Sequence, residues 1–165
     1  MILGFLNGCG VKGGDAGLIS AGDRIQAPEI KADYLNVPPP GLKLADLKGK
    51  VVVLDYWATW CGPCRMEIPD LVKLYNDYHS KGLEMIGLSV EINEAQPKEN
   101  FNKFIAGYNI TYPIGLASME TLQNYGVNPI PATFFIDKKG KVALSFIGVH
   151  PAEQFTAAVE KLLAE

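Results

Sequence analysis

Two cysteines separated by two residues follow a continuous apolar run, and this arrangement constrains the fold more than any other feature of the chain. The run spans residues 51–57 (VVVLDYW), and residues 60–64 (WCGPC) carry the pair, Cys61 and Cys64. A β-branched and aromatic run of this kind is typical of a strand buried on both faces. Pro63 suits the first turn of a helix, where no amide donor is needed. The pair is therefore expected between a strand and a helix, a position that favours a redox site over an inert structural disulfide.

The composition indicates one soluble globular domain without a nucleic-acid surface. The chain has 165 residues, of which 48% are hydrophobic and 20% charged, an ordinary balance for a single domain. The net charge is −3 and no basic run or stripe is present, which argues against nucleic-acid binding. No apolar stretch reaches the length that spans a bilayer.

The number of cysteines argues against a disulfide framework or a metal site. Cys9, Cys61 and Cys64 are the only cysteines of the chain, whereas a structural zinc ion takes four ligands. The remaining candidates, His79 and His150, are scattered along the sequence. We expect no metal, and we expect both histidines at the surface near helix ends.

The N-terminal residues 1–26 are expected to form a flexible leader, followed by one domain over residues 27–165. Glycines are frequent in the leader, which is typical of a linker. Residues 6–9 (LNGC) resemble the lipobox of bacterial lipoproteins, although Asn7 departs from the usual small or aliphatic residue. Cys9 is thus a candidate for lipidation and a membrane tether. The alternative is an ordinary cysteine in an unstructured leader.

The hydrophobic pattern predicts strands and helices in alternation, ending in a hairpin and a helix. Parallel strands linked by helices imply an α/β sandwich with helices on both faces of the sheet. The expected strands are residues 29–36, with 42–44 pairing back, and 51–57, 83–90, 112–116, 133–137 and 141–147. The expected helices are residues 63–80, with a kink at Pro69, and segments around 101–108, 119–125 and from 151 onward.

The chemistry of the cysteine pair depends on a thiolate, which is the attacking species in disulfide exchange. Cys61 is expected just before the helix, where unpaired amides and aligned dipoles favour negative charge. Cys64, one turn further in, is expected to resolve the mixed disulfide. Asp55 interrupts the apolar strand, and a buried carboxyl with a raised pKa could take the proton of Cys64. The alternative is a solvated aspartate at a strand end.

A proline directly before the strand at 133–137 is a candidate for a cis peptide bond. Cis is accessible to X–Pro bonds at a cost of only about 0.5–1 kcal/mol. A cis bend at Ile130–Pro131 could hold backbone groups beside the cysteines and present an edge to an extended partner segment. From the residues alone an ordinary trans turn is the favoured interpretation, and Pro129 is expected to be of that kind.

Together these motifs match a known family. Residues 57–65 (WATWCGPCR), Pro69 and Ile130–Pro131 resemble the thioredoxin fold. The segment 27–165 is similar to the TlpA/ResA-like thiol–disulfide oxidoreductases. This resemblance implies a three-layer α/β sandwich with a central mixed sheet, an extra N-terminal hairpin and an inserted central helix and strand.

The resemblance also implies roles for individual residues. Cys61 and Cys64 would be the redox pair, with no separate cofactor. Pro131 would be cis, and Asp55 would hold the position of the buried acid of thioredoxins. The residues expected to contact partners are Trp60, Gly62, Pro63 and Ile130. Core packing is an equal alternative for Trp60.

The chain departs from the family pattern at two places. The lysine that accompanies the buried acid in thioredoxins is replaced near Gly87 or Leu88, which leaves the tuning of Asp55 open. Some relatives carry a functional glutamate after the second strand, and Glu91 is the nearest candidate here.

The function that follows is a dithiol reductase of partner-protein disulfides outside the cytoplasm, as in cytochrome c maturation. Its expected partners are oxidised protein thiols and an upstream dithiol donor, and the expected location is periplasmic or extracytoplasmic. We expect a monomer. The alternatives are a peroxiredoxin-type peroxidase, which the sequence Thr59-Trp60-Cys61 disfavours, and a non-enzymatic docking module on the same fold.

Overall fold

A computed structural model describes residues 18–91 and 98–165 of the chain. The expectations for Cys9 and for residues 1–17 fall outside the described residues. Within them, no helix is both long enough and apolar enough to cross a bilayer.

The elements follow the alternation that the hydrophobic pattern predicts. The strands are β1 (Ile25–Gln26), β2 (Ala32–Tyr34), β3 (Val51–Trp57), β4 (Leu83–Ser89), β5 (Ile114–Ala117), β6 (Ala132–Ile136) and β7 (Lys141–Ile147). The α-helices are α1 (Gly62–Tyr78), α2 (Lys98–Gly107), α3 (Met119–Tyr125) and α4 (Ala152–Ala164). The described residues also contain two short 3₁₀ helices, η1 (Leu44–Leu47) and η2 (His79–Lys81).

The seven strands form one mixed sheet in the order β1-β7-β6-β3-β4-β5-β2. The apolar run 51–57 is the central strand β3, with every residue buried. It pairs in parallel with β4 and antiparallel with β6. The end of β3 therefore lies beside the beginning of β6, and this brings residues far apart in the sequence to one edge of the sheet.

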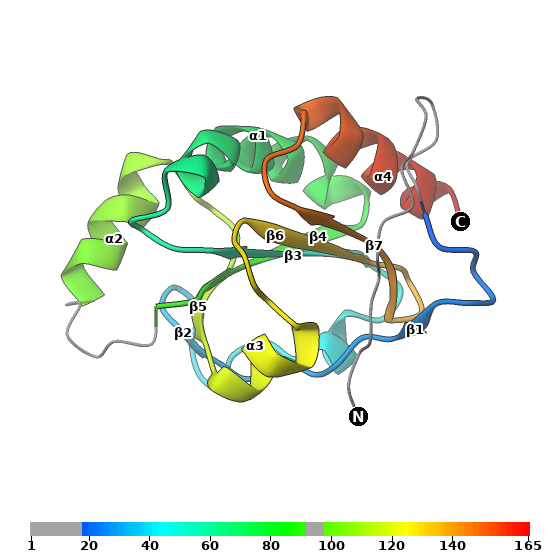
Figure 1. The fold of residues 1–165 in the computed structure, drawn as a ribbon, viewed down its shortest axis with the longest axis horizontal. Coiled ribbons are helices and arrows are strands. Elements are labelled where there is room, and N and C mark those ends of the chain that lie inside the picture. The colour runs from blue at the N-terminus through cyan, green and yellow to red at the C-terminus, as the bar shows by residue number, and fades with distance from the viewer. Residues whose placement is uncertain (1–17, 92–97) are drawn as a thin grey trace.

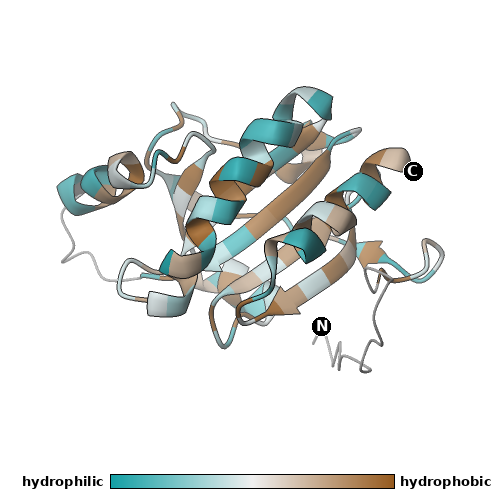
Figure 2. Ribbon diagram, turned by 90° about the horizontal axis from the view of Figure 1, so that it is seen from above, coloured by the Kyte–Doolittle hydropathy of each residue, from teal (hydrophilic) through white to brown (hydrophobic). Residues whose placement is uncertain are grey.

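The helices cover both faces of the sheet, as expected. Figure 1 shows α1, α2 and α4 above the strands and α3 below them. Seen from above, α1 and α4 lie side by side across the sheet with their hydrophilic residues turned outward (Figure 2). This three-layer arrangement is the thioredoxin-like sandwich that the resemblance implied.

Each face of the sheet has its own hydrophobic core. Because side chains alternate along a strand, Val53 and Trp57 of β3 face the core under α1 and α4, whereas Leu54 and Tyr56 face the core over α3. Both cysteines belong to the first of these cores. By the same alternation Asp55 points to their side of the sheet.

The N-terminal part of the domain differs from the expectation. β1 and β2 do not form a hairpin, because β1 pairs with β7 and β2 with β5, at opposite edges of the sheet. Residues 29–36 form only the short strand β2. Residues 42–44 do not pair back, and the chain instead enters η1.

The packed domain also begins before residue 27, the expected boundary. The Ile19 backbone N–H donates to the Ala143 carbonyl at 2.8 Å. The buried guanidinium of Arg24 reaches Asp137 at 3.1 Å and Glu165 at 2.6 Å. These contacts tie the segment from residue 19 to β7, to the turn after β6 and to the end of α4. The boundary drawn at residue 27 was therefore too late.

Candidate functional site

The two cysteines form a disulfide at the start of helix α1, with their Cα atoms 5.3 Å apart. Cys61 is the N-cap residue, with extended backbone dihedrals, and Pro63 lies in the first turn. Cys61 Sγ accepts a hydrogen bond from the Cys64 backbone N–H at 3.3 Å. That amide is one of the helix-end donors without an intrahelical partner. It would favour a negative charge on the Cys61 sulfur once the disulfide opens.

The surroundings of the two sulfurs differ from those of the preceding tryptophan. Cys64 is 2% exposed and Cys61 5%. Trp60, immediately before them, is 68% exposed. Its ring therefore does not fill the core, and it is available to contact another molecule beside the disulfide.

Asp55 lies in the interior of the domain. It is 2% exposed, and the Thr133 hydroxyl donates to its Oδ1 at 3.4 Å. Burial, and then the nearby charge of Glu67, raise the pKa of Asp55 to about 7, against a smaller opposing effect of the Thr133 hydrogen bond. A carboxyl that titrates near neutral pH can both accept and return a proton. The solvated alternative for Asp55 is thereby excluded.

Glu67 is a second buried carboxyl that the sequence reasoning missed. It lies on α1 one turn after Cys64 and is buried with the apolar face of the helix. The His150 backbone N–H donates to its Oε1 at 2.7 Å, whereas Oε2 has no partner among the described residues. Burial raises the pKa of Glu67, and the His150 contact partly offsets this effect. The signal in the sequence was a glutamate at a helical position where the pattern requires an apolar side chain.

The structure shows why no lysine accompanies Asp55. Gly87 of β4 is its direct partner in the parallel register. A Cβ atom on Gly87 would lie 2.5 Å from Ile114 Cδ1 and 3.1 Å from Trp57 Nε1. The space beside the acid is therefore filled by apolar and aromatic groups, and Glu67 is the charged group that acts on it instead.

The Ile130–Pro131 peptide bond is cis, as the resemblance implied. Pro131 immediately precedes β6, whose first residue, Ala132, pairs with Tyr56 near the end of β3. The bend therefore lies at the edge of the sheet where the chain leaves β3 for the cysteines. The Asn128–Pro129 bond is cis as well, so the expectation of an ordinary trans proline at 129 was wrong.

Glu91 lies at the same edge, two residues after the end of β4, and is 8% exposed. Its carboxylate accepts hydrogen bonds from the Thr59 backbone N–H at 2.9 Å and from the Thr59 hydroxyl at 2.6 Å. Thr59 belongs to the short loop between β3 and α1. The structure thus brings Glu91 to the loop that carries Cys61, whereas spacing along the sequence did not settle its position.

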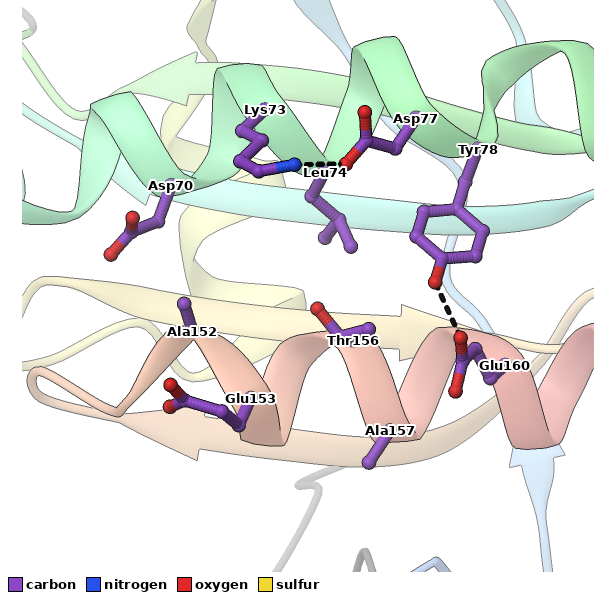
Figure 3. A pocket seen from close by; sticks show the side chains of 10 residues that line it. All are labelled: Asp70, Lys73, Leu74, Asp77, Tyr78, Ala152, Glu153, Thr156, Ala157 and Glu160. Carbon is purple, nitrogen blue, oxygen red and sulfur yellow. Dashed lines mark hydrogen bonds and ion pairs between the residues drawn. The ribbon is translucent and has the colours of Figure 1, made fainter.

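A groove between two helices lies away from this chemistry. It has a volume of about 370 Å³ and separates α1 from α4 (Figure 3). Most of its lining residues carry a polar or charged group. Lys73 pairs with Asp77, and Tyr78 bonds to Glu160. Neither cysteine lines it, so this groove is not the redox site.

A comparison with known proteins agrees with this geometry. Residues 25–145 match the model of the AhpC/TSA family. The chain is 37% identical over 122 residues to the thiol-disulfide oxidoreductase ResA of Bacillus thuringiensis (strain Al Hakam), covering 73% of this chain and 68% of that protein.

Solved structures of thiol–disulfide proteins are also similar. A thiol:disulfide interchange protein of the thioredoxin family from Chlorobium tepidum TLS has a TM-score of 0.75 at 28% identity, covering 85% of this chain and 97% of that one. A secreted thiol-disulfide isomerase from Corynebacterium glutamicum has a TM-score of 0.79 at 25% identity, covering 90% and 91%. The chain has a disulfide at the start of a helix and a buried acid on the same side of the sheet, and it is similar to these proteins. It therefore belongs to the AhpC/TSA family of thioredoxin-fold proteins and is a ResA-like thiol-disulfide oxidoreductase.

Proposed function

We propose that the chain is a dithiol reductase in which Cys61 attacks and Cys64 resolves. The observation that carries this proposal is the position of Cys61 Sγ at the N-cap of α1, with the Cys64 amide directed at it. A helix N-terminus stabilises a thiolate. The second sulfur is the more buried of the two and lies within the same turn. This arrangement suits it to intramolecular attack.

The reaction begins with the reduced pair. The Cys61 thiolate attacks one sulfur of a partner disulfide, and that bond breaks as a mixed disulfide forms. The released partner sulfur takes up a proton. Cys64 then loses its proton to the Asp55 carboxylate and attacks Cys61 Sγ. The second partner sulfur leaves and is protonated in turn. The partner disulfide has gained two electrons and two protons, and Cys61–Cys64 is oxidised.

The other residues of the proposed site lie at the same edge of the sheet, where a partner protein would bind. We assign partner contact to Trp60, whose ring is exposed beside the disulfide. Gly62 and Pro63 are exposed in the first turn of α1. Ile130 and the cis residue Pro131 form the bend that precedes β6. An extended partner segment could lie across this bend with its disulfide beside Cys61.

We assign the reaction to an extracytoplasmic compartment, with partner proteins such as those of cytochrome c maturation. Support comes from relatives: the similar protein from C. glutamicum is named as secreted, and the B. thuringiensis relative is a ResA protein. An upstream dithiol donor would regenerate the reduced pair, because the reaction consumes one dithiol per turnover. A lipid anchor at Cys9 would fit this location.

A trapping experiment tests the assignment of the two sulfurs. Cys64→Ser should accumulate a mixed disulfide between Cys61 and a disulfide-containing partner peptide, because the resolving thiol is gone. Cys61→Ser should form no such adduct and should lose reduction of insulin disulfides. Retained insulin reduction in Cys61→Ser would overturn the proposal. Rapid turnover of hydrogen peroxide by the wild-type protein with a thiol donor would favour the peroxidase alternative instead.

A further inference from the structure

The carboxylate of Glu91 joins the end of strand β4 to the loop that carries the attacking cysteine. Its Oε2 accepts hydrogen bonds from the Thr59 backbone N–H and from the Ser89 hydroxyl, both at 2.9 Å. Its Oε1 accepts the Thr59 hydroxyl at 2.6 Å. Hydrogen bonds to an ionised carboxylate are stronger than those between neutral groups. The two oxygens therefore hold both the backbone and the side chain of Thr59.

The surroundings of Glu91 are built to keep this carboxylate in place. Ser89 is fully buried, and its Oγ accepts from the Glu91 backbone N–H at 3.2 Å while donating to the carboxylate. The Val90 backbone N–H donates to the Trp57 carbonyl at 2.9 Å. Three consecutive residues after and at the end of β4 are thus held to the end of β3 and to the loop that follows it: Ser89 and Val90 pair with Trp57, and Glu91 bonds to Thr59.

Thr59 is separated from Cys61 by a single residue, so its position bears on the geometry of the sulfur. The hydrogen bond from the Cys64 amide to Cys61 Sγ spans 3.3 Å, an ordinary length for a sulfur acceptor. Its strength depends on where the loop places the sulfur relative to the helix N–H groups. Once the disulfide is reduced, the backbone of Cys61 still holds it at the helix end, because its N–H donates to the Ala58 carbonyl and its carbonyl accepts from the Arg65 N–H, both at 3.1 Å. The position of the Sγ atom then depends on the loop before α1, which Glu91 holds at Thr59.

We propose that Glu91 is a positioning residue for the redox reaction. Its hydrogen bonds to Thr59 keep Cys61 Sγ at the N-terminus of α1 in the reduced enzyme. The proposal rests on the proposed function in one respect, the assignment of Cys61 as the attacking thiol. The proposed effect of Glu91 is on the position of Cys61 Sγ and does not come from the negative charge of its carboxylate. A neighbouring carboxylate by its charge alone would disfavour a thiolate, whereas the placement it enforces favours one.

The opposite signs of these two effects make the proposal testable. The measurement is the rate of Cys61 alkylation by iodoacetamide as a function of pH in the reduced protein, together with the reduction potential against glutathione. In Glu91→Ala we expect the midpoint of the alkylation profile to move to higher pH and the rate at pH 6 to fall about 5- to 10-fold, because the loop loses its charge-assisted bonds. The reduction potential of the Cys61–Cys64 pair should shift as well, because the Cys61 thiolate of the reduced form is stabilised less in the variant than in the wild type.

The conservative variant distinguishes placement from charge. In Glu91→Gln the amide oxygen can still accept from the Thr59 N–H, so the alkylation rate should stay within about 2-fold of the wild type. A midpoint that moves to lower pH in both variants would show a charge effect and overturn the proposal. An unchanged profile and potential in Glu91→Ala would overturn it too.

Two further variants guard against simple loss of stability. Glu84→Ala is the matched control, since Glu84 is on β4, is also 8% exposed, and pairs with Lys50 at 2.6 Å toward the other end of the strand. It should leave the alkylation profile unchanged even if it lowers the melting temperature. If Glu91→Ala does not fold, Thr59→Val removes the hydroxyl contact alone and should shift the midpoint in the same direction. No shift there would count against the proposal. Cys61→Ser, scored for insulin reduction, tests the proposed function separately.

Discussion

Asp55 of β3 and Gly87 of β4 are direct partners in the parallel register, so the buried acid has no side chain facing it from β4. The space above the glycine is filled by Ile114, Trp57 and Tyr112. The charged group that acts on Asp55 comes instead from the helix, as Glu67. A carboxylate neighbour raises the pKa of an acid, whereas a lysine would lower it. This exchange keeps Asp55 close to the pH at which it can both take and return a proton.

Replacing the buried acid should slow the resolving step. In Asp55→Asn we expect release of the partner from the mixed disulfide to slow by about 10- to 100-fold at pH 7, because the proposed proton acceptor of Cys64 is removed. The inflection near pH 7 that Asp55 contributes should disappear from the rate profile. Stopped-flow tryptophan fluorescence would measure the step. An unchanged inflection would show that another group carries the proton.

Asp55 should also make the free energy of unfolding depend on pH, with a contribution that falls as the pH rises. The folded-state pKa of Asp55 is raised to about 7, whereas an unfolded aspartate titrates near 3.9. Between these values the folded protein binds more protons than the unfolded chain, so this contribution to stability is complete at low pH and is lost as the pH rises. Asp55→Asn should therefore raise the melting temperature at pH 8 and change it little at pH 4. A uniform shift at both pH values would contradict this account.

Removing the charge of Glu67 should move the titration of Asp55. In Glu67→Gln the like charge is gone, so the ionised form of Asp55 is less disfavoured and its pKa should fall. The midpoint of the resolving-step rate profile should move to lower pH accordingly. The matched control is Glu153→Gln, an exposed glutamate at the start of α4. If both variants shifted the midpoint equally, the effect would be one of net charge and not of this pair.

The close packing over Gly87 predicts a large effect from a single methyl group. In Gly87→Ala the new Cβ would lie 2.5 Å from Ile114 Cδ1 and 3.2 Å from the Tyr112 ring. Overpacking of this kind typically costs about 1–3 kcal/mol. Gly107→Ala is the control, because a Cβ there meets nothing within 4 Å. Urea unfolding followed by circular dichroism would compare the two, and equal stability would contradict the packing described here.

Several elements were predictable because their causes are local. The run 51–57 is apolar throughout, and it forms the fully buried central strand. Pro63 and the cysteine spacing indicated the start of α1, which begins one residue earlier, at Gly62. The burial of Asp55 followed from its place within an apolar strand, since the residues on both sides of it had to be inside.

The N-terminal strands were not predictable, because their partners are distant in the sequence. β1 pairs with β7 and β2 with β5. Neither pair is joined by a short turn, so no turn sequence predicts that these strands pair. Glu67 was missed for a related reason. A glutamate on a helix is normally solvated, and its burial here depends on His150, which supplies the hydrogen bond from 83 residues away.

The sequence by itself determined the chemistry and the layer order of this protein. The cysteine spacing, the helix start and the alternation of strands with helices follow from interactions between neighbouring residues, and these can be read along the chain. Only the tertiary structure decided which groups surround the disulfide. The effect of Glu67 on Asp55, the pairing of Asp55 with Gly87 and the bond from Glu91 to Thr59 all join separate elements. Their existence depends on how the strands register and how α1 packs on them, and no local preference encodes that.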